Sequence, residues 1–341
     1  MTVAPDPTAP AVSDPVSTLP GSPGEHLASP VTQAALRIQH GLLAGAREFL
    51  ADAGFTEVLP PVIGPVTDPG ARGAKQVDVD YYGHRYKLMT SAILYKQAAL
   101  RAFDRIYSIA PNVRLEPLET ANTDRHLAEF HQIDVELAHG TRDDAVEVAT
   151  GLITHAVRRV VELYPEELAR LGRDPRAFDE LREGVFDRRT HADAVARLRA
   201  LGHDQNPGAE IDWEGEAILS REATRPFFVT DYPKGSRGFY DRENPDQPGT
   251  LCNFDLLAPE GFGELISGSQ READYARVIA RMRETGENPA KYGWYLDLLR
   301  EGLPGSAGFG IGVQRLTRYV AGLRSVWQAT AFPKVPGVVA P

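Results

Sequence analysis

The chain has 341 residues, of which 42% are hydrophobic and 25% charged, a composition that excludes fibrous and largely disordered proteins. Its net charge of −10 gives no overall basic footprint for binding nucleic acid, although local patches are compatible with it. No segment approaches the roughly 18 apolar residues of a membrane span. The first 30 residues carry neither Lys nor Arg, so a cytoplasmic protein without a secretory signal is expected.

The N-terminal part of the chain changes character near residue 30. Residues 1–30 hold seven prolines among small and polar residues, which predicts a disordered leader. From there apolar side chains recur at helical spacing up to Gly54, which predicts a helix over residues 31–53 and one domain over residues 31–341. Residues 55–66 are apolar but contain three prolines, which favours an edge strand or an extended interface segment.

The rest of the domain mixes strands and helices. Three strand-like runs and one helix (92–103) are predicted between residues 86 and 138, and a mostly helical insertion at about 140–224. Later elements are strands at 226–230, 250–257 and 263–267, helices at 270–285 and 288–301, a glycine-spaced strand, and a helix at 312–322. Strands with helices inserted between them indicate an α+β fold, an antiparallel sheet flanked by helices. The single cysteine, Cys252, has apolar neighbours and is expected to be a core residue rather than a nucleophile.

Two predicted strands, around residues 105–116 and 129–138, have chemically different faces, because side chains alternate along a strand. The apolar face is expected in the core and consists of Ile109, Val113, Leu115, Ile133, Val135 and Leu137. The other face consists of Asn112, Arg114, Glu116, Phe130, Gln132, Asp134 and Glu136. A solvated surface would alternate in the same way, but two adjacent strands of this kind favour a floor for a polar ligand.

A third run, FDLLAPEGFGELI, is typical of a hairpin with Pro259 and Glu260 in the turn. That register places Asp255 directly opposite Glu264, with Cβ atoms about 4.5 to 5.5 Å apart on one face. Two carboxylates so close repel each other unless a cation lies between them, and hard oxygen ligands indicate Mg²⁺. Two exposed acids on a hairpin are the alternative explanation.

Three glycines alternate in GFGIG, residues 308–312, just before a helix that carries Arg315 in its first turn. Glycines on one strand face leave room for a ligand or for another backbone, and Arg315 would then reach the same space. Close packing between backbones is the alternative explanation of this pattern.

These segments together resemble a known family. IAPNVRLEP with TDRHLAEFHQIDVELA resembles motif 2 of the class II aminoacyl-tRNA synthetases, and GFGIGVQRLTRYVAGL with AFPKVPG resembles motif 3. GFTEVLPPV is similar to the looser motif 1 at the family's dimer interface, and residues 227–272 resemble the asparaginyl and aspartyl branch. The resemblance covers about residues 31–337 and implies the synthetase fold, ATP as a co-substrate, Mg²⁺ and a homodimer.

The resemblance also implies roles at the nucleotide side of the site. Arg114 would hold the α-phosphate of ATP, and Arg315 would close the other side. Glu116 would help place the adenine, which would stack on Phe130. The motif 2 loop would lay two side chains over the β- and γ-phosphates, Arg125 and His126.

The remaining implied roles concern the amino acid and the metal. Asp134 would bind the substrate α-ammonium, and Arg271 a substrate carboxylate or carbonyl. Lys96 matches a lysine that contacts the aspartate side chain in aspartyl enzymes and is absent from asparaginyl enzymes, and Gln132 lies on the same face. Asp255 and Glu264 fall where the family binds Mg²⁺.

Several departures from the synthetase pattern are informative. Ile93 stands where aspartyl enzymes have a glutamine, and Pro304-Gly305 replaces a usual Pro-His pair. No anticodon-binding barrel of roughly 100 residues is expected before the first helix, so anticodon recognition is not expected. The changes cluster on the amino-acid side and in the tRNA-binding part.

Such a chain resembles most the free-standing asparagine synthetase related to asparaginyl-tRNA synthetase. The resemblance implies an ATP-dependent, AMP-forming ligase that activates an aspartate-like carboxylate as an adenylate and passes it to ammonia or an amine. Cations and Mg²⁺ would stabilise the charge that develops at the α-phosphate, and no protein nucleophile is required. Two alternatives stay open: a truncated synthetase that charges tRNA or another carrier, and a non-catalytic ligand-sensing relative.

Overall fold

The computed structural model describes residues 21–69 and 74–338. Within them, eight strands form the main sheet, which is antiparallel except for the outer pairs β1–β5 and β7–β8. In spatial order its strands are β1 (Thr56–Glu57), β5 (Arg105–Val113), β6 (Glu129–Ala138), β11 (Ser306–Gly312), β10 (Gly263–Gln270), β9 (Asn253–Ala258), β8 (Phe227–Thr230) and β7 (Asp187–Thr190). A small antiparallel sheet consists of β2 (Ile63–Gly64), β4 (His84–Leu88) and β3 (Asp78–Tyr81).

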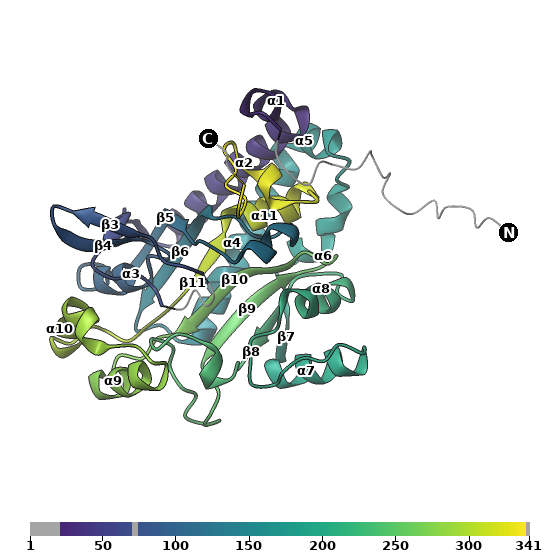
Figure 1. The fold of residues 1–341 in the computed structure, drawn as a ribbon. Coiled ribbons are helices and arrows are strands. Elements are labelled where there is room, and N and C mark those ends of the chain that lie inside the picture. Colours follow the sequence, from purple (N-terminus) through teal and green to yellow (C-terminus); the bar gives the residue numbers. More distant parts are fainter. Residues whose placement is uncertain (1–20, 70–73, 339–341) are drawn as a thin grey trace.

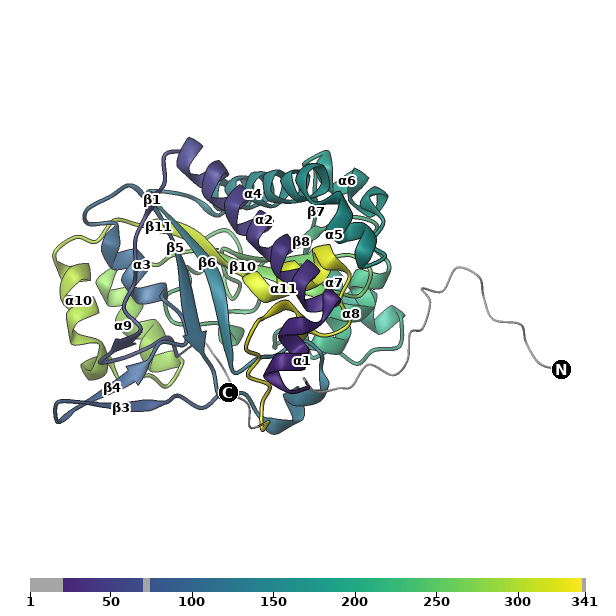
Figure 2. The ribbon, with the colours of Figure 1, turned by 90° about the horizontal axis from the view of Figure 1, so that it is seen from above.

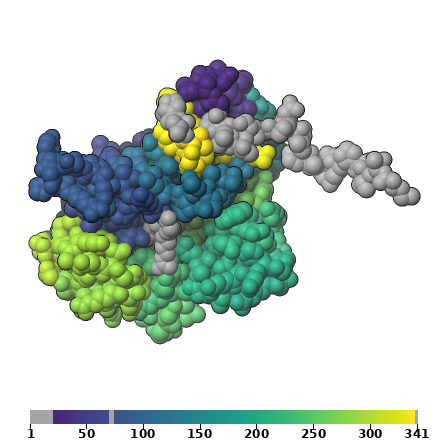
Figure 3. Space-filling model, viewed as in Figure 1, coloured from purple at the N-terminus to yellow at the C-terminus, as the bar shows by residue number. Residues whose placement is uncertain are grey.

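Helices surround this sheet (Figure 1). They are α1 (Pro23–Ala28), α2 (Pro30–Asp52), α3 (Ile93–Ala99), α4 (Arg142–Leu163), α5 (Pro165–Arg170), α6 (Asp179–Arg182), α7 (His191–Ala200), α8 (Trp213–Arg221), α9 (Tyr275–Glu284), α10 (Gly293–Arg300) and α11 (Val313–Ala321). In Figures 1 and 3, α9 and α10 form a block at the lower left, α7 and α8 lie at the lower right, and the β3–β4 hairpin projects at the left. The predicted α+β fold with an antiparallel sheet flanked by helices is confirmed.

The main core lies between the sheet and the pair α2 and α4, which run beside each other (Figure 2). Helix α2 begins at Pro30, which suits a first helical turn because no N–H is needed there. Its stripe includes Ile38 and Leu42, at most 2% exposed. The helices approach closely at Gly45, where a Cβ would lie 3.0 Å from the Cα of Ala156. The predicted helix over residues 31–53 is thereby confirmed.

The predicted leader is partly wrong. Residues 1–20 lie outside the described residues, but α1 occupies much of the remaining ten. Ser22 and Glu25 form a capping box, and Pro23 takes the first turn, where proline is favourable. His26 is buried, with Nε2 2.7 Å from the carbonyl oxygen of Thr330 and its ring packed on Trp327. Composition predicted disorder because it ignores such capping positions.

The predicted insertion at about 140–224 is mostly helical, from α4 to α8, but it also contributes strand β7, which the sequence analysis missed. Cys252 is half-buried rather than in the core, and burial raises the pKa of its thiol. No helix among residues 21–69 and 74–338 combines the length and apolar character needed to cross a bilayer.

The two-faced strands are confirmed, with one exception. Ile133, Val135 and Leu137 lie in the main core, whereas Asn112 of β5 pairs with Phe130 of β6 on the polar side. Leu115 was expected in the core, but it is 41% exposed because β5 ends at Val113.

The predicted hairpin register between β9 and β10 is wrong. Asp255 lies opposite Ser267, and Glu264 lies opposite Leu257, with an irregularity between Glu264 and Ile266. This bulge lets two successive residues, Leu265 and Ile266, both enter the main core. Packing against the core therefore sets the register, which the turn residues alone did not reveal.

Candidate active site

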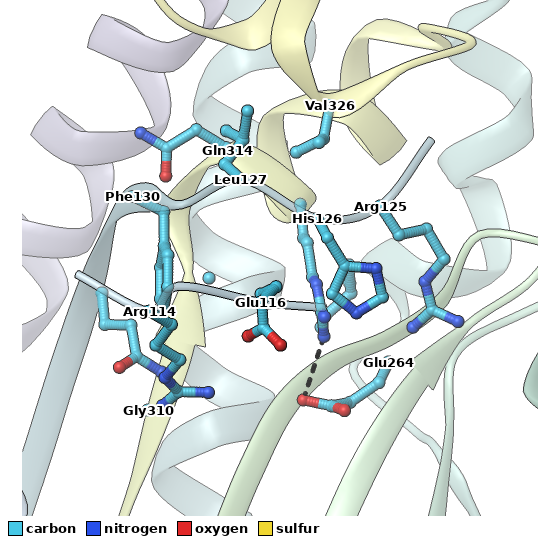
Figure 4. A pocket seen from close by; sticks show the side chains of 14 residues that line it. Arg114, Glu116, Arg125, His126, Leu127, Phe130, Glu264, Gly310, Gln314 and Val326 are labelled. Atoms are coloured by element: carbon cyan, nitrogen blue, oxygen red, sulfur yellow. Dashed lines mark ion pairs between the residues drawn. The ribbon is translucent and has the colours of Figure 1, made fainter. Parts of the chain in front are cut away.

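Two adjoining pockets lie over the polar side of the sheet. The Arg315 pocket, with about 540 Å³ of empty space, also contains Glu116, Arg125, His126 and Phe130 (Figure 4). The Arg271 pocket, with about 850 Å³ of empty space, also contains Lys96, Asp134, Arg237 and Asp241. The side chains common to both linings are those of Arg114, Gln132 and Glu264, together with Gly310. A ligand lying across these shared residues would contact both pockets.

The glycines of β11 make room for the polar side chains of β6. Gly308 pairs with Glu136 and Gly310 with Asp134. A Cβ on Gly308 would lie 2.1 Å from Glu136 Oε2, and one on Gly310 would lie 3.1 Å from Asp134 Oδ1. The glycine spacing thus serves both predicted purposes, close packing and access to the site.

Arg114 marks the border between the two pockets. Its Nε donates to the carbonyl oxygen of Thr90 at 3.0 Å, and its guanidinium lies 5.2 Å from the ring centre of Phe130. One face of Phe130 is therefore covered, so an aromatic base could stack only on the other face unless Arg114 turned away. Beside them burial raises the pKa of Glu116, which favours its neutral form more than in water.

The loop between β5 and β6 brings two further side chains to the Arg315 pocket. His126 Nδ1 lies 2.5 Å from the hydroxyl of Thr123, and burial together with nearby arginines lowers the pKa of His126 to about 3. A neutral imidazole can approach these cations without repulsion. Arg125 is 6% exposed and forms a 2.5 Å ion pair with Glu216 of α8.

The proposed metal ligands are close to each other despite the corrected register. Burial raises the pKa of Asp255, and the Glu264 carboxylate raises it further. Asp255 Oδ2 bonds to Arg237, but Oδ1 is buried without a hydrogen-bond partner among the described residues. Glu264 Oε1 lies 3.3 Å from Arg315 Nη1.

A pair of carboxylates with one unpartnered oxygen fits a hard divalent cation that takes its other ligands from phosphate. Within the described part of the chain, no group of three or more His, Cys, Asp or Glu residues is arranged to hold a metal by itself. The Mg²⁺ assignment therefore stays a prediction that depends on a bound polyphosphate.

The floor of the Arg271 pocket is a buried ion network. Lys96 Nζ lies 3.1 Å from Asp134 Oδ1 and 3.3 Å from Glu136 Oε2, and it also donates to the carbonyl oxygens of Val135 and Phe309. The Lys96 side chain is 3% exposed. Its donors are thus directed at the protein, whereas Asp134 Oδ2 is buried without a hydrogen-bond partner in the described residues.

Arg271 closes the network from β10. Its Nε and Nη2 donate to the two oxygens of Glu136 at 3.0 and 3.1 Å. Its Nη1 donates to Asp241 at 3.3 Å and to Ser269 at 2.6 Å. Gln132 is held by Asn112, whose Nδ2 donates to Gln132 Oε1 at 2.6 Å.

The structure thus brings every sequence-predicted site residue to these two pockets or directly beside them; their individual roles stay predictions. It also adds residues that the sequence analysis did not assign. Arg237 bonds to Asp255, Ser267 and Glu210, and Glu216 bonds to Arg125. These partners are far apart in sequence, so no local pattern marks them. Glu136 could have been assigned, because the strand alternation already placed it on the polar face.

Comparison with known proteins identifies the family. Residues 25–336 match the model of the class II tRNA synthetases of the D, K and N type. The chain belongs to this family. It is 35% identical to the asparagine–tRNA ligase of Pyrococcus abyssi over 316 residues, which is 93% of this chain and 71% of that protein. It is 34% identical to the enzyme of the same name from Thermus thermophilus, covering 89% of this chain and 69% of the relative.

A solved structure supports the same assignment. The asparaginyl-tRNA synthetase of Pyrococcus horikoshii, in complex with asparaginyl-adenylate, superimposes with a TM-score of 0.87 at 34% identity, covering 94% of this chain and 72% of that one. Family membership confirms the prediction of a ligase that acts through an aminoacyl-adenylate. The relatives support the synthetase-like alternative better than the asparagine synthetase-like main prediction.

Proposed function

We propose that the protein activates asparagine, or a similar amino acid with a neutral side chain, as an adenylate and transfers the acyl group to tRNA or another carrier. The names of the similar proteins support this proposal. The observation that carries it is the bonding of Arg271.

Arg271 has few donors left for a substrate. A guanidinium has five N–H groups, and four of those on Arg271 bond to Glu136, Asp241 and Ser269 within the described structure. The fifth suits a single carbonyl oxygen, as in a carboxamide. A carboxylate is bound best by two parallel N–H groups, which Arg271 does not offer in this state.

The charge of the Arg271 pocket points the same way. The described residues that line it include five acids and four bases, so no surplus positive charge awaits a second substrate carboxylate. The cations Lys96 and Arg271 are already paired with Asp134, Glu136 and Asp241. An aspartate-like substrate, which the sequence predicts, would add an anion to this balance.

The reaction can be assigned to residues of the chain. Asp134, with its unpartnered Oδ2, would bind the substrate α-ammonium, and Gln132 would lie beside it. The substrate α-carboxylate attacks the α-phosphorus of ATP; a mixed anhydride forms, the α–β phosphate bond breaks, and pyrophosphate leaves. Arg114 and Arg315 would stabilise the charge that develops on the α-phosphate. Mg²⁺ held by Asp255 and Glu264 would neutralise phosphate charge.

Pyrophosphate exchange tests the substrate assignment. We expect asparagine to support exchange with at least 10-fold higher kcat/KM than aspartate, because aspartate would bring an unpaired charge into a buried site. Aspartate as the better substrate would refute the neutral side chain, and no exchange with any amino acid would refute the adenylation proposal for this protein.

A second candidate acceptor is ammonia or a small amine. Glu210, whose side chain is 47% exposed, lines the Arg271 pocket, and the whole chain carries a charge of −10. Negative charge at this position attracts a cationic amine and repels the phosphates of nucleic acid. Mass spectrometry of products formed with total tRNA and with an amine panel separates the two acceptors: an aminoacyl ester supports the carrier, and an amide supports the amine.

We also propose that the chain forms a homodimer through residues 55–66. Leu59 and Val62 in this segment are 83% and 51% exposed, next to the edge strand β1. Burying such side chains on a partner would remove them from water. Sedimentation at micromolar concentration should give a dimer, and Leu59→Glu should shift it towards monomer; a monomeric wild type would refute the proposal.

A further inference from the structure

Glu216 links the helical insertion to the Arg315 pocket. It lies in the first turn of α8, which packs beside β9 and β10 (Figure 1), and it is 8% exposed. Its Oε2 accepts a hydrogen bond from Arg125 Nη2 at 2.5 Å and another from the backbone N–H of Glu264 at 2.9 Å. One oxygen atom therefore joins the loop cation to the residue that faces Arg315.

The packing around this oxygen leaves little freedom. Gly263 has a φ of +73°, and a Cβ there would lie 2.8 Å from Arg125 Nη1 and 2.9 Å from Glu216 Oε2. Arg125 Nη1 also donates to the carbonyl oxygen of Trp213, at 3.4 Å. The start of β10 thus presses against the ion pair, and a glycine is required for this approach.

Arg125 is held on one side and free on another. Its Nε is buried without a hydrogen-bond partner in the described structure, and the residue lines the Arg315 pocket. Donors fixed in advance bind an anion at a lower entropic cost than donors on a mobile side chain. The carboxylate of Glu216 is therefore placed to orient Arg125 rather than to block it.

We propose that Glu216 is a positioning residue for the nucleotide, which orients Arg125 towards the polyphosphate and fixes the backbone at Glu264. This rests on the proposed function, because a polyphosphate is the anion that the Arg315 pocket would take. A purely electrostatic role is the competing explanation, and a carboxylate that competes with phosphate for Arg125 is another.

Three variants separate these explanations. Glu216→Gln keeps the shape but removes the charge, Glu216→Asp keeps the charge but moves it by one methylene, and Glu214→Gln is a matched control on the exposed side of the same turn. ATP dependence of pyrophosphate exchange, ATP·Mg²⁺ binding by calorimetry and thermal unfolding are measured for each. We expect kcat/KM for ATP to fall about 10-fold in both Glu216 variants, with the amino-acid KM within 2-fold of wild type and the control unchanged.

The pair with Arg125 provides the deciding test. If Glu216 acts through Arg125, adding Glu216→Gln to Arg125→Lys should lower kcat/KM for ATP by less than 2-fold more. Wild-type kinetics in Glu216→Asp, tighter ATP binding in Glu216→Gln, or fully additive effects would each overturn the proposal. If the wild type shows no exchange, the adenylation proposal fails, whereas the calorimetric comparison still tests Glu216.

Discussion

The Arg315 pocket keeps arginine donors for a ligand, whereas the Arg271 pocket has bonded its cations to protein carboxylates. Arg125 Nε has no partner in the described structure, and Arg315 has one carboxylate contact at 3.3 Å. Lys96 and Arg271, by contrast, are each bonded to two carboxylates. The comparison teaches that charge serves to bind a polyanion in one pocket and to fix hydrogen-bond geometry in the other.

The largest expected effect concerns the shared border of the two pockets. Asp255→Asn and Glu264→Gln should each lower adenylate formation on the order of 1000-fold, because each removes a carboxylate proposed to bind Mg²⁺ but keeps its shape. Circular dichroism should show an intact fold. Full activity of either variant in pyrophosphate exchange would mean that the metal assignment is wrong.

The next effect should be confined to the Arg271 pocket. Lys96→Met leaves Asp134 and Glu136 without one of their cations, so we expect a loss of roughly 10- to 150-fold in kcat/KM for the amino acid. Breaking a buried pair also costs about 3 to 5 kcal/mol of stability. Urea unfolding and exchange kinetics measure the two effects.

The KM for ATP is the control for Lys96→Met and should barely change. An equal loss for ATP and for the amino acid would break the distinction between the pockets. Wild-type amino-acid kinetics would show that Lys96 does not orient Asp134.

The glycines of β11 allow a matched comparison. Gly310→Ala would place a Cβ 3.0 Å from Gln132 Nε2, whereas the nearest atoms to a Cβ on Gly312 lie 3.5 Å away, on Arg315. We expect Gly310→Ala to raise the amino-acid KM about 10-fold, because the displaced groups lie in the Arg271 pocket. Gly312→Ala should change either KM by less than 3-fold; the reverse order would contradict this geometry.

The smallest expected effect is that of salt. Raising ionic strength from 0.05 to 0.5 M should increase the KM for ATP about 3-fold and the amino-acid KM by less than 2-fold, because buried pairs are screened less than accessible charges. Potassium chloride and potassium glutamate should act alike. Equal sensitivity of both constants would show that the two pockets do not differ in this respect.

The sequence predicted the features of this site that depend on local pattern. Alternation along residues 129–138 identified the polar face, because a strand has a period of two whatever surrounds it. The hairpin register failed because Leu265 and Ile266 both enter a core built from distant helices. Helix α1 was missed because proline content was taken as disorder, although Pro23 and Pro30 begin helices.

Long-range pairs were beyond reach for the same reason. Glu216 and Arg125 are 91 residues apart, and Arg271 and Glu136 are 135 residues apart. Only the fold brings them together. The family resemblance supplied Arg125 and Arg271, but not the carboxylates that orient them.

The central position of β6 and β11 has a consequence for hydrogen exchange. Both strands are bonded on each side within the sheet, between β5 and β10. Their amides should therefore exchange with solvent only when the whole domain opens, and not through local fluctuations. Asp134 and Gly310 then lie in the slowest-exchanging part of the molecule, so a destabilising substitution elsewhere should reduce the amount of native protein and leave the turnover of each native molecule unchanged.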